Sequence, residues 1–475
     1  MTLVEQPLQT IKMNANEVQP DLSSNCGYLL DAGFFQTRTP KTANTKFSQE
    51  NSSSPSRRYA ICGVSDALFE VTGEVSEDEF ASLGMTKGKS HPISKETRTN
   101  IETLLATKSL LSFAGGSPTN TLYGASNLGL RCAYIGCVGN DRQGYDYLQQ
   151  LRQNKIDPFC STKPGPSCVC YTLVTPDGQR SFGLDFGVTK QLSEGEIAPA
   201  LIEDSLFLHF SAYELRGDTP MKKAMLAAVQ VARNVGTKIS IDLGDGWLMK
   251  ETQSTLLDLF ADKVSIIFAN EIEADAFCEV ERDDEGKPLN VLDLHQITDS
   301  PRIRYRSPEN TLSPSPERIT RPHSTEITKT QPKKGITEFA SSPAPVCYRS
   351  GQPGQKCQCC ESCNCETQCR YNGEQLPSEY LKLLKHCDIL VIKRGSSGSI
   401  ALRQSEMYEC SAYRLSTIVD TNGAGDNFQA GFFYGLMRGM CLGMCLKMGN
   451  FYASKVIQVR GPQSQVRVEG LEYIA

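Results

Sequence analysis

The stretch from Asp420 to Phe432, DTNGAGDNFQAGF, places small residues directly before an aspartate and a helix-compatible segment. Small residues let an anion approach the free backbone N–H groups at the start of a helix. Asp426 would disfavour a resting phosphate, but it suits a general base that takes the proton from an attacking hydroxyl. The alternative is that Asp426 only caps a helix after a glycine-rich turn. The pattern therefore predicts either a phosphoryl-transfer site or a capped helix.

Four further segments carry polar side chains or glycine pairs at positions that could bind a ligand. They are GVSDALFEV, FAGGSPTNTLYGASNLG, ANEIEADAF and IKRGSSGSI. Taken singly, paired glycines are usually turns and a lone aspartate is usually a cap. Their order along the chain makes it more plausible that all four segments contribute to one site.

The whole string DTNGAGDNFQAGF resembles the C-terminal signature of the ribokinase-like carbohydrate and nucleoside kinases, the phosphofructokinase-B family. Each defined position of the pattern Asp-Thr-x-Gly-Ala-Gly-Asp-x-Phe-x-x-Gly-Phe is matched. The resemblance implies that Asp426 is the catalytic base. It also implies that the amides of Gly423, Ala424 and Gly425 form the anion hole for the transferred phosphoryl group. That family uses no Walker-type loop, and this sequence contains none.

The same resemblance assigns roles to residues in the other segments. It implies that the substrate is bound by Asp66, Gly115, Gly116 and Asn120, with Arg216 facing the purine or a phosphate. An exposed arginine after a strand is an equally good reading of Arg216. ATP would be bound by Asn270, Lys393, Gly395, Gly398 and Asn450, although Lys393 and Arg394 replace the usual Thr and apolar residue. Mg²⁺ would be held by Glu273, through water, and a monovalent cation such as K⁺ near Asp420.

Longer stretches resemble the adenosine-kinase-like branch, and most closely bacterial inosine-guanosine kinases. This implies transfer of the γ-phosphoryl group of ATP to the 5′-hydroxyl of a purine nucleoside, inosine, guanosine or adenosine, in purine salvage. One alternative is a sugar kinase of the same family, of the ribokinase or fructokinase type. Another is a non-catalytic metal-binding or regulatory protein on a kinase scaffold. The resemblance also leads us to expect a homodimer formed through the lid.

The elements that must position these residues alternate along the chain. From Leu110 to Glu279, strand-like and helix-like segments follow each other, which predicts an α/β fold with a mainly parallel sheet and helices on both faces. The block CVCYTLVTPDGQRSFGLDF predicts a hairpin in a small β-sheet lid. We also expect YRLSTIV to form a strand directly before Asp420, and 75–107 to form one or two helices.

Composition divides the chain into three parts. Residues 1–57 are polar and rich in Ser, Thr, Asn and Gln, which predicts a disordered tail. Residues 58–475 would form the kinase domain. Within it, 280–376 lacks an apolar period and is rich first in Pro, Ser and Thr and then in Cys, so it is interpreted as an insertion.

Six cysteines of this insertion fall within thirteen residues: Cys357, Cys359, Cys360, Cys363, Cys365 and Cys369. Cys-x-Cys and Cys-x-x-Cys spacings let thiolates converge on a soft ion, so Zn²⁺ or Cu⁺ would suit them. Redox or disulfide chemistry and an incidental sequence remain alternatives. The cluster lies outside the kinase motifs, so no catalytic role is expected.

Charge and hydropathy limit the partners. The 475 residues carry 49 basic and 54 acidic side chains, and this net charge of −5 gives no reason to expect nucleic acid. The longest apolar runs are too short to span a bilayer. The N-terminus lacks a basic start followed by an apolar core, so we expect a cytoplasmic protein without a membrane partner.

Overall fold

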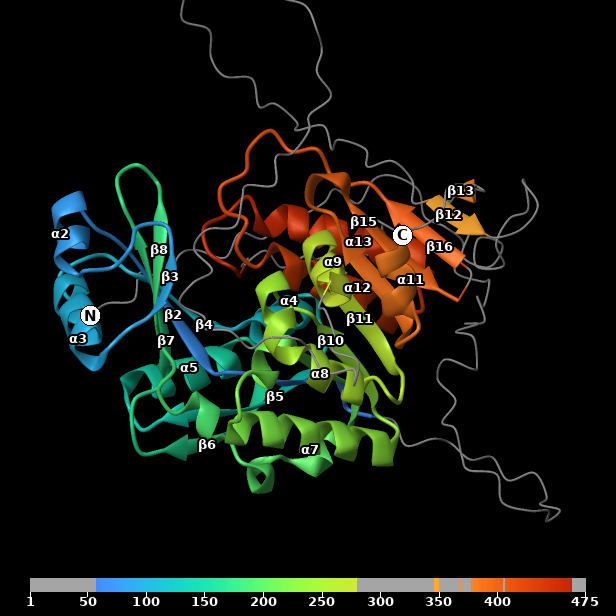
Figure 1. The fold of residues 1–475 in the computed structure, drawn as a ribbon, viewed down its shortest axis with the longest axis horizontal. Coiled ribbons are helices and arrows are strands. Elements are labelled where there is room, and N and C mark those ends of the chain that lie inside the picture. Colours follow the sequence, from blue (N-terminus) through green and yellow to red (C-terminus); the bar gives the residue numbers. More distant parts are fainter. Residues whose placement is uncertain (1–56, 280–345, 350–367, 370–376, 405, 464–475) are drawn as a thin grey trace, which may run out of the picture. The chain divides into compact units, whose positions relative to one another are not determined.

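Apolar runs of the chain assemble into one large, mainly parallel sheet (Figure 1). The structure is a computed structural model that describes residues 57–279, 346–349, 368–369, 377–404 and 406–463. Within these residues the sheet has the order β13-β12-β16-β15-β14-β11-β10-β9-β1-β5-β6. In chain order the strands are β1 (Tyr59–Val64), β5 (Cys132–Gly139), β6 (Ile156–Lys163), β9 (Ser205–Ser211), β10 (Lys238–Asp242), β11 (Val264–Asn270), β12 (Val346–Arg349), β13 (Gln368–Cys369), β14 (Cys387–Lys393), β15 (Ser399–Arg403) and β16 (Glu406–Cys410).

The strands from β6 to β14 in that order run parallel, whereas β15 and β16 are antiparallel to their neighbours. Their central segments are almost wholly buried, as expected for parallel strands covered on both faces. The carboxyl ends of parallel strands meet at one edge of the sheet, where ligands bind in open α/β folds. This edge is where the candidate site must be sought.

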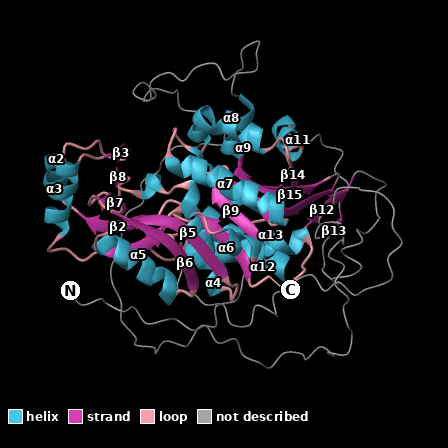
Figure 2. Ribbon diagram, turned by 90° about the horizontal axis from the view of Figure 1, so that it is seen from below, coloured by secondary structure: helices cyan, strands magenta, loops and turns pink. Residues whose placement is uncertain are grey.

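Helices cover both faces of the large sheet (Figure 2). On one face α4 (Ser117–Asn127), α12 (Ala424–Met437) and α13 (Leu442–Val456) pack in a core that includes Phe432 and Tyr452. On the other face α7 (Pro220–Val235), α8 (Met249–Leu259), α9 (Glu271–Glu279) and α11 (Ser378–Leu384) pack around residues such as Met225 and Leu256. The expected layering of helices on both faces is confirmed.

A second, smaller sheet has the order β3-β8-β7-β2-β4. Its strands are β2 (Leu68–Glu74), β3 (Ser90–Pro92), β4 (Leu111–Gly115), β7 (Cys168–Val174) and β8 (Arg180–Asp185). The strands β7 and β8 pair antiparallel around the turn in which Thr175 N donates to Gln179 O over 3.0 Å. The hairpin is therefore confirmed, and this second sheet, which we call the lid, is the small sheet expected from the sequence.

Two element predictions differ from the structure. YRLSTIV forms no strand: Ile418 and Val419 are exposed, and Val419 N donates to Ile457 O at the end of α13. Its apolar residues therefore do not join a sheet. The sequence analysis also missed β6, whose IDPFCSTK run contains Pro158 and alternates in burial. An edge strand pairs on one side only, so it tolerates proline and needs no continuous apolar run.

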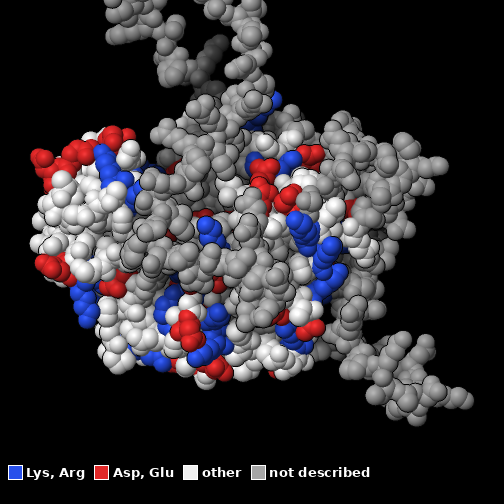
Figure 3. All heavy atoms as spheres, viewed as in Figure 1, with Lys and Arg blue, Asp and Glu red and all other residues white. Residues whose placement is uncertain are grey.

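The expected helical region 75–107 contains α2 (Glu77–Ser82) and α3 (Lys95–Leu105), with β3 between them. Three acidic residues occupy the first turn of α2, and red atoms gather over that helix at the left edge of Figure 3. Acidic side chains are favoured at a helix N-terminus. None of the described helices is long and apolar enough to cross a membrane.

The predicted tail, 1–57, apart from Arg57, and nearly all of the predicted insertion, 280–376, lie outside the described residues. The short strands β12 and β13 are the described part of that insertion, and β12 pairs antiparallel with β16. All described residues belong to one compact unit.

Candidate active site

The loop before α12 presents backbone N–H groups at the edge of the sheet. Gly423 is the N-cap of α12 with φ +70°, and a Cβ there would lie 2.6 Å from Pro462 O. The amides of Gly423 and Gly425 meet no acceptor within the described part of the chain, whereas the amide of Ala424 donates to Thr421 O over 3.2 Å. Two of the three predicted anion-hole amides are therefore available for an anion.

Asp426 follows these amides in the first turn of α12. Ser117 Oγ donates to its Oδ1 over 2.8 Å, and Asn120 Nδ2 donates to its Oδ2 over 3.0 Å. Burial raises the pKa of Asp426 to about 6, with the charge of Asp242 adding to the effect. This carboxylate is ionised at neutral pH but is a better base than an ordinary aspartate. The structure thus brings the predicted base and the predicted substrate residue Asn120 together.

Lys393, at the end of β14, lies beside the same loop. Its Nζ is 2.8 and 3.1 Å from the two carboxylate oxygens of Asp242 at the end of β10. A Cβ on Gly425 would lie 3.3 Å from that ammonium. Although burial lowers it, the neighbouring charges of Asp242 and Glu273 raise the pKa of Lys393 above its ordinary value. A permanent positive charge therefore lies next to the free amides.

Asp242 was missed by the sequence analysis. It is 2% exposed, and Gln429 Nε2 of α12 also donates to it, so it ties β10, β14 and α12 together. A signal was present, because Asp242 ends the strand-like run KISID and such ends carry ligands in parallel sheets. Nothing in the sequence indicated that Lys393 would be its partner.

Asn270 and Glu273 bind each other at the junction of β11 and α9. Asn270 N and Nδ2 donate to the carboxylate of Glu273 over 2.8 and 2.6 Å, and Glu273 N donates to Asn270 Oδ1 over 2.8 Å. Burial raises the pKa of Glu273 to about 7, and Lys393 opposes this. A divalent cation would favour the ionised carboxylate, so this pair fits a Mg²⁺ ion.

Within the described residues no three His, Cys, Asp or Glu side chains converge as a metal site. A Mg²⁺ ion at Glu273 would therefore take most of its ligands from water and phosphate oxygens, which is common for this ion.

Asp66 lies between β1 and β2 and is held by two cations. Lys190 Nζ is 2.8 Å and Arg216 Nη2 3.5 Å from its Oδ2. Gly116, with φ +99°, lies so close that a Cβ there would be 2.9 Å from Asp66 O. Gly116 directly precedes Ser117 and α4, so one short segment separates Asp66 from the partners of Asp426.

The lid contributes a carboxyl group that the sequence analysis missed. Glu70 of β2 lies against Gly115, where a Cβ would be 2.5 Å from Glu70 Oε1. Burial, and next the charge of Asp426, raise the pKa of Glu70 to about 7. Asn422 Nδ2 donates to it over 3.4 Å. A single glutamate within a strand carries no pattern that would have revealed this position.

Asp420, the predicted ligand of a monovalent cation, binds a guanidinium group from the lid. Arg180 Nη1 of β8 is 2.6 Å from its Oδ1, and the amides of Asn422 and Gly461 donate to its two oxygens over 2.9 Å each. Burial raises the pKa of Asp420, but Arg180 and the two amides outweigh it, so the pKa lies below its usual value. This carboxylate already has a positive partner.

The predicted nucleotide loop follows β14. Gly395 and Gly398 have φ +52° and +91°, and a Cβ on Gly398 would lie 2.1 Å from Cys410 O. Asn450 of α13 donates to Cys410 O over 3.0 Å and accepts from Ser399 Oγ over 3.1 Å. Asn450 therefore holds the ends of β15 and β16 together, and its contact with a nucleotide stays a prediction.

Five of the six cysteines of the expected thiolate cluster lie outside the described residues. The sixth, Cys369, is in β13, and its side chain is not described. The metal predicted for this cluster stays a prediction.

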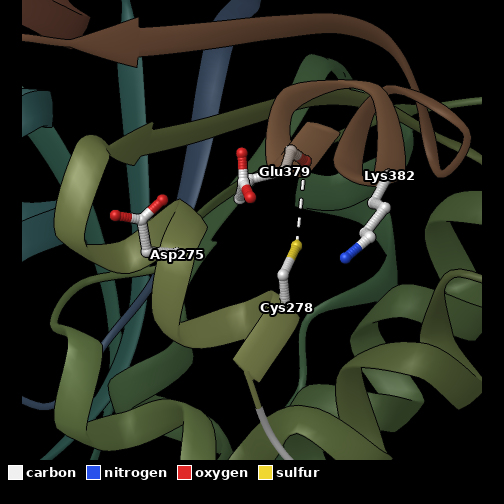
Figure 4. Close-up of a pocket in the computed structure, with 4 residues that line it drawn as sticks. All are labelled: Asp275, Cys278, Glu379 and Lys382. Carbon is white, nitrogen blue, oxygen red and sulfur yellow. Dashed lines mark hydrogen bonds between the residues drawn. The ribbon is translucent and has the colours of Figure 1, made fainter. Parts of the chain in front are cut away.

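A polar cavity of about 400 Å³ opens between α9 and α11, and it contains none of the predicted site residues (Figure 4). Its described lining residues are Asp275, Cys278, Glu379 and Lys382. Cys278 Sγ donates to Glu379 O over 3.8 Å, so the last turn of α9 touches the first turn of α11. The described helices on either side of the predicted insertion, α9 and α11, are therefore in contact.

A mainly parallel α/β sheet, a small lid sheet, and an aspartate behind free amides at a helix start together define the ribokinase-like class of fold. The chain belongs to the pfkB family of carbohydrate kinases, whose sequence model matches residues 91–297 and 373–468. The family resemblance and the fold expected from the sequence are both confirmed.

Individual relatives share only part of the chain. Guanosine-inosine kinase of Escherichia coli (strain K12) is 26% identical over 228 residues, which are 46% of this chain and 52% of that protein. The chain thus spans about half the length of this relative. The 5-dehydro-2-deoxygluconokinase of Geobacillus thermodenitrificans is 23% identical over 364 residues, 75% of this chain and 80% of that protein.

Solved structures support the fold. Adenosine kinase from Sinorhizobium meliloti has a TM-score of 0.59 at 22% identity and covers 86% of this chain and 97% of its own. A probable sugar kinase from Rhizobium etli has the same TM-score at 22% identity and covers 88% and 99%.

Proposed function

We propose that this protein transfers the γ-phosphoryl group of ATP to the 5′-hydroxyl of a purine nucleoside, a reaction of purine salvage. The observation that carries the proposal is the environment of Asp426. This carboxylate follows two free amides, is oriented by Ser117 and Asn120, and has a pKa raised to about 6. The name of the relative guanosine-inosine kinase supports a nucleoside as the acceptor.

In this mechanism Asp426 takes the proton from the attacking hydroxyl as the phosphoryl group transfers. The amides of Gly423 and Gly425 and the ammonium of Lys393 stabilise the charge on the transferred group. Asp66 accepts hydrogen bonds from the ribose hydroxyls, because a carboxylate can accept from two adjacent groups. These residues orient the acceptor and hold its proton.

Mg²⁺ near Glu273 and Asn270 would neutralise charge on the β- and γ-phosphates of ATP. The chain's own contribution is the buried carboxyl of Glu273, which Asn270 orients through three hydrogen bonds. We also propose that the lid excludes water from the site, since Glu70 and Arg180 of the lid reach Asn422 and Asp420.

The Asp426→Asn variant tests the proposed function. With ATP, Mg²⁺ and a panel of inosine, guanosine, adenosine, ribose and fructose, we expect kcat for the preferred nucleoside to fall about 10²–10⁴-fold. Asp258→Asn, on the exposed face of α8, is the matched control and should turn over like the native protein. Equal turnover of Asp426→Asn and the native protein would refute the base assignment, whereas a native protein that phosphorylates no acceptor of the panel would favour a non-catalytic role.

A sugar kinase is the second candidate, and one feature favours it. Lys190 and Arg216 place two positive charges beside Asp66, which would also suit an acidic sugar. The relative 5-dehydro-2-deoxygluconokinase is named for such an acceptor. The same panel, extended with a sugar acid, decides: phosphorylation of sugars but of no nucleoside would overturn the nucleoside proposal.

A further inference from the structure

Arg216 lies among aromatic side chains, beside the candidate acceptor residue Asp66. Its guanidinium carbon is 5.1 Å from the ring centroid of Phe186, 5.2 Å from that of Tyr213 and 6.0 Å from that of Trp247. Its Nε–H donates to Tyr213 O over 3.0 Å, which fixes the plane of the group. Trp247 is 45% exposed although it is a large apolar side chain. These rings, which we call the aromatic cluster, border a site that has a fixed cation.

Arg216 is connected to the candidate acceptor site through Asp66, because its Nη2 is 3.5 Å from Asp66 Oδ2. If Asp66 binds the ribose hydroxyls, a base attached to C1′ lies within reach of the groups around Asp66. Arg216 is one of these groups, and the aromatic cluster lies around its guanidinium.

The ion pair with Asp66 does not use all the N–H donors of the Arg216 guanidinium. Lys190 Nζ is the closer partner, at 2.8 Å from Asp66 Oδ2, against 3.5 Å for Arg216 Nη2. Arg216 Nη1 has no hydrogen-bond partner among the residues that the structure describes. An arginine has five N–H donors and no acceptor, so the group still has donors to offer a ligand.

We propose that Arg216 binds O6 and N7 of a 6-oxopurine, and that the protein is selective for inosine and guanosine over adenosine. This rests on the proposed function. A 6-oxopurine presents two acceptors on that edge, as guanine does to arginine in DNA, whereas adenine presents N7 as an acceptor but a donor at N6. Adenine would set its amino group against a donor-only side chain.

The aromatic cluster favours a purine over the acidic sugar. A carboxylate would need the charge of Arg216 and Lys190, but it would gain nothing from three rings. A planar base gains from aromatic faces by stacking, which is worth about 1–3 kcal/mol per base in nucleic-acid complexes. Both features of the site, the donors and the rings, therefore match one ligand class.

The first test compares substrates on the native protein. Inosine, guanosine, adenosine and purine riboside, which lacks a substituent at C6, are assayed with saturating ATP and Mg²⁺. We expect kcat/KM for inosine to exceed that for adenosine and for purine riboside by about 5- to 150-fold. This comparison does not depend on the folding of any variant.

The second test compares Arg216→Met and Arg216→Gln. Met keeps an apolar stem but has no donor, so the ratio of kcat/KM for inosine to adenosine should fall toward one. Gln can donate to N7 and accept from N6, so we expect it to lower that ratio further than Met does. Arg142→Gln, on the exposed side of α5 (Arg142–Gln153), is the control and should leave the ratio unchanged.

The outcomes separate this inference from the proposed function. Adenosine preferred by the native protein, or a ratio unmoved in both Arg216 variants, overturns the inference but leaves nucleoside kinase activity in place. An equal loss for all nucleosides would show that Arg216 only positions Asp66, and would also overturn it. Phosphorylation of a sugar acid and of no nucleoside would overturn both.

Discussion

At the scale of single residues, the site depends on carboxyl groups held away from water. Asp426, Glu70 and Glu273 all have pKa values raised mainly by burial, to about 6, 7 and 7. Such groups destabilise the fold when ionised, which is common where a catalytic base is tuned toward neutral pH. The two predictions that follow concern Asp426, whose carboxylate accepts hydrogen bonds from Ser117 and Asn120.

Activity should depend on pH through Asp426. Because only the carboxylate can accept the proton, kcat/KM should fall about tenfold per pH unit below about 6 and level off above about 7. Ser117→Ala removes a donor that lowers this pKa, so it should move the acid limb to higher pH. ATP itself titrates identically with both proteins, so the difference between the two profiles is the readout. Coincident profiles would contradict the assignment.

The ionised carboxylate of Asp426 is needed for activity, but it should lower the free energy of unfolding. Since the folded-state pKa of Asp426 is raised, its ionisation costs the folded state nothing below about pH 4 and the full amount above about pH 6. Asp426→Asn should therefore increase the free energy of unfolding by about 1–3 kcal/mol at pH 8 relative to its effect at pH 4. Urea denaturation at both pH values measures this. A pH-independent effect would show that the native carboxylate is not destabilising.

At the scale of elements, the loop before α12 requires a glycine for two separate reasons. Gly423 has φ +70°, and a Cβ there would also clash with Pro462 O at 2.6 Å. Gly84 has φ +65° with nothing within 4 Å, so Gly84→Ala isolates the cost of the left-handed conformation, about 1–2 kcal/mol. Gly423→Ala should cost more and should lower kcat at least tenfold, because the free amides shift. Thermal melts and kcat of both variants check this; equal melts would refute the clash.

The sequence allowed the alternation of strands and helices, the β7–β8 hairpin and the string around Asp426 to be predicted, because these are local patterns. It did not allow prediction of contacts between distant segments. Arg180 and Asp420 are 240 positions apart, and Lys393 and Asp242 are 151 apart. The YRLSTIV run is apolar, but its hydrogen bonds go to the end of α13, which only the tertiary structure decides.

The contact between lid and core through Arg180 leads to a prediction about K⁺. In Arg180→Ala the buried carboxylate of Asp420 loses its positive partner, so a monovalent cation should bind there more strongly. We expect activity and melting temperature to depend more on KCl, against choline chloride, than in the native protein. Arg460→Ala breaks the exposed pair with Glu74 and is the control, since such pairs contribute little. An unchanged K⁺ response would show that Asp420 does not bind this ion.

At the scale of the whole molecule, the kinase residues are all contributed by segments on either side of 280–376. The last turn of α9 and the first turn of α11 are in contact through Cys278 and Glu379. A chain that leaves and returns at adjacent points can be shortened at little cost in closure entropy. We therefore predict that the protein can transfer phosphoryl groups without the insertion 280–376.

Replacing 280–376 by a short Gly-Ser linker should keep kcat/KM within a few-fold of the native value and abolish the predicted binding of Zn²⁺ or Cu⁺. The deletion also removes β12, which leaves β16 as an edge strand; Glu406 and Glu409 on β16 then oppose edge-to-edge pairing. A full-length variant with the six cysteines from Cys357 to Cys369 changed to serine is the matched control. It should lose metal, measured by elemental analysis, with its activity unchanged. The shortened chain could stay folded and lose more than about tenfold in kcat/KM while the serine variant keeps its activity. That result would show that the backbone of the insertion contributes to the site. A loss in both proteins would make the metal part of the catalytic machinery.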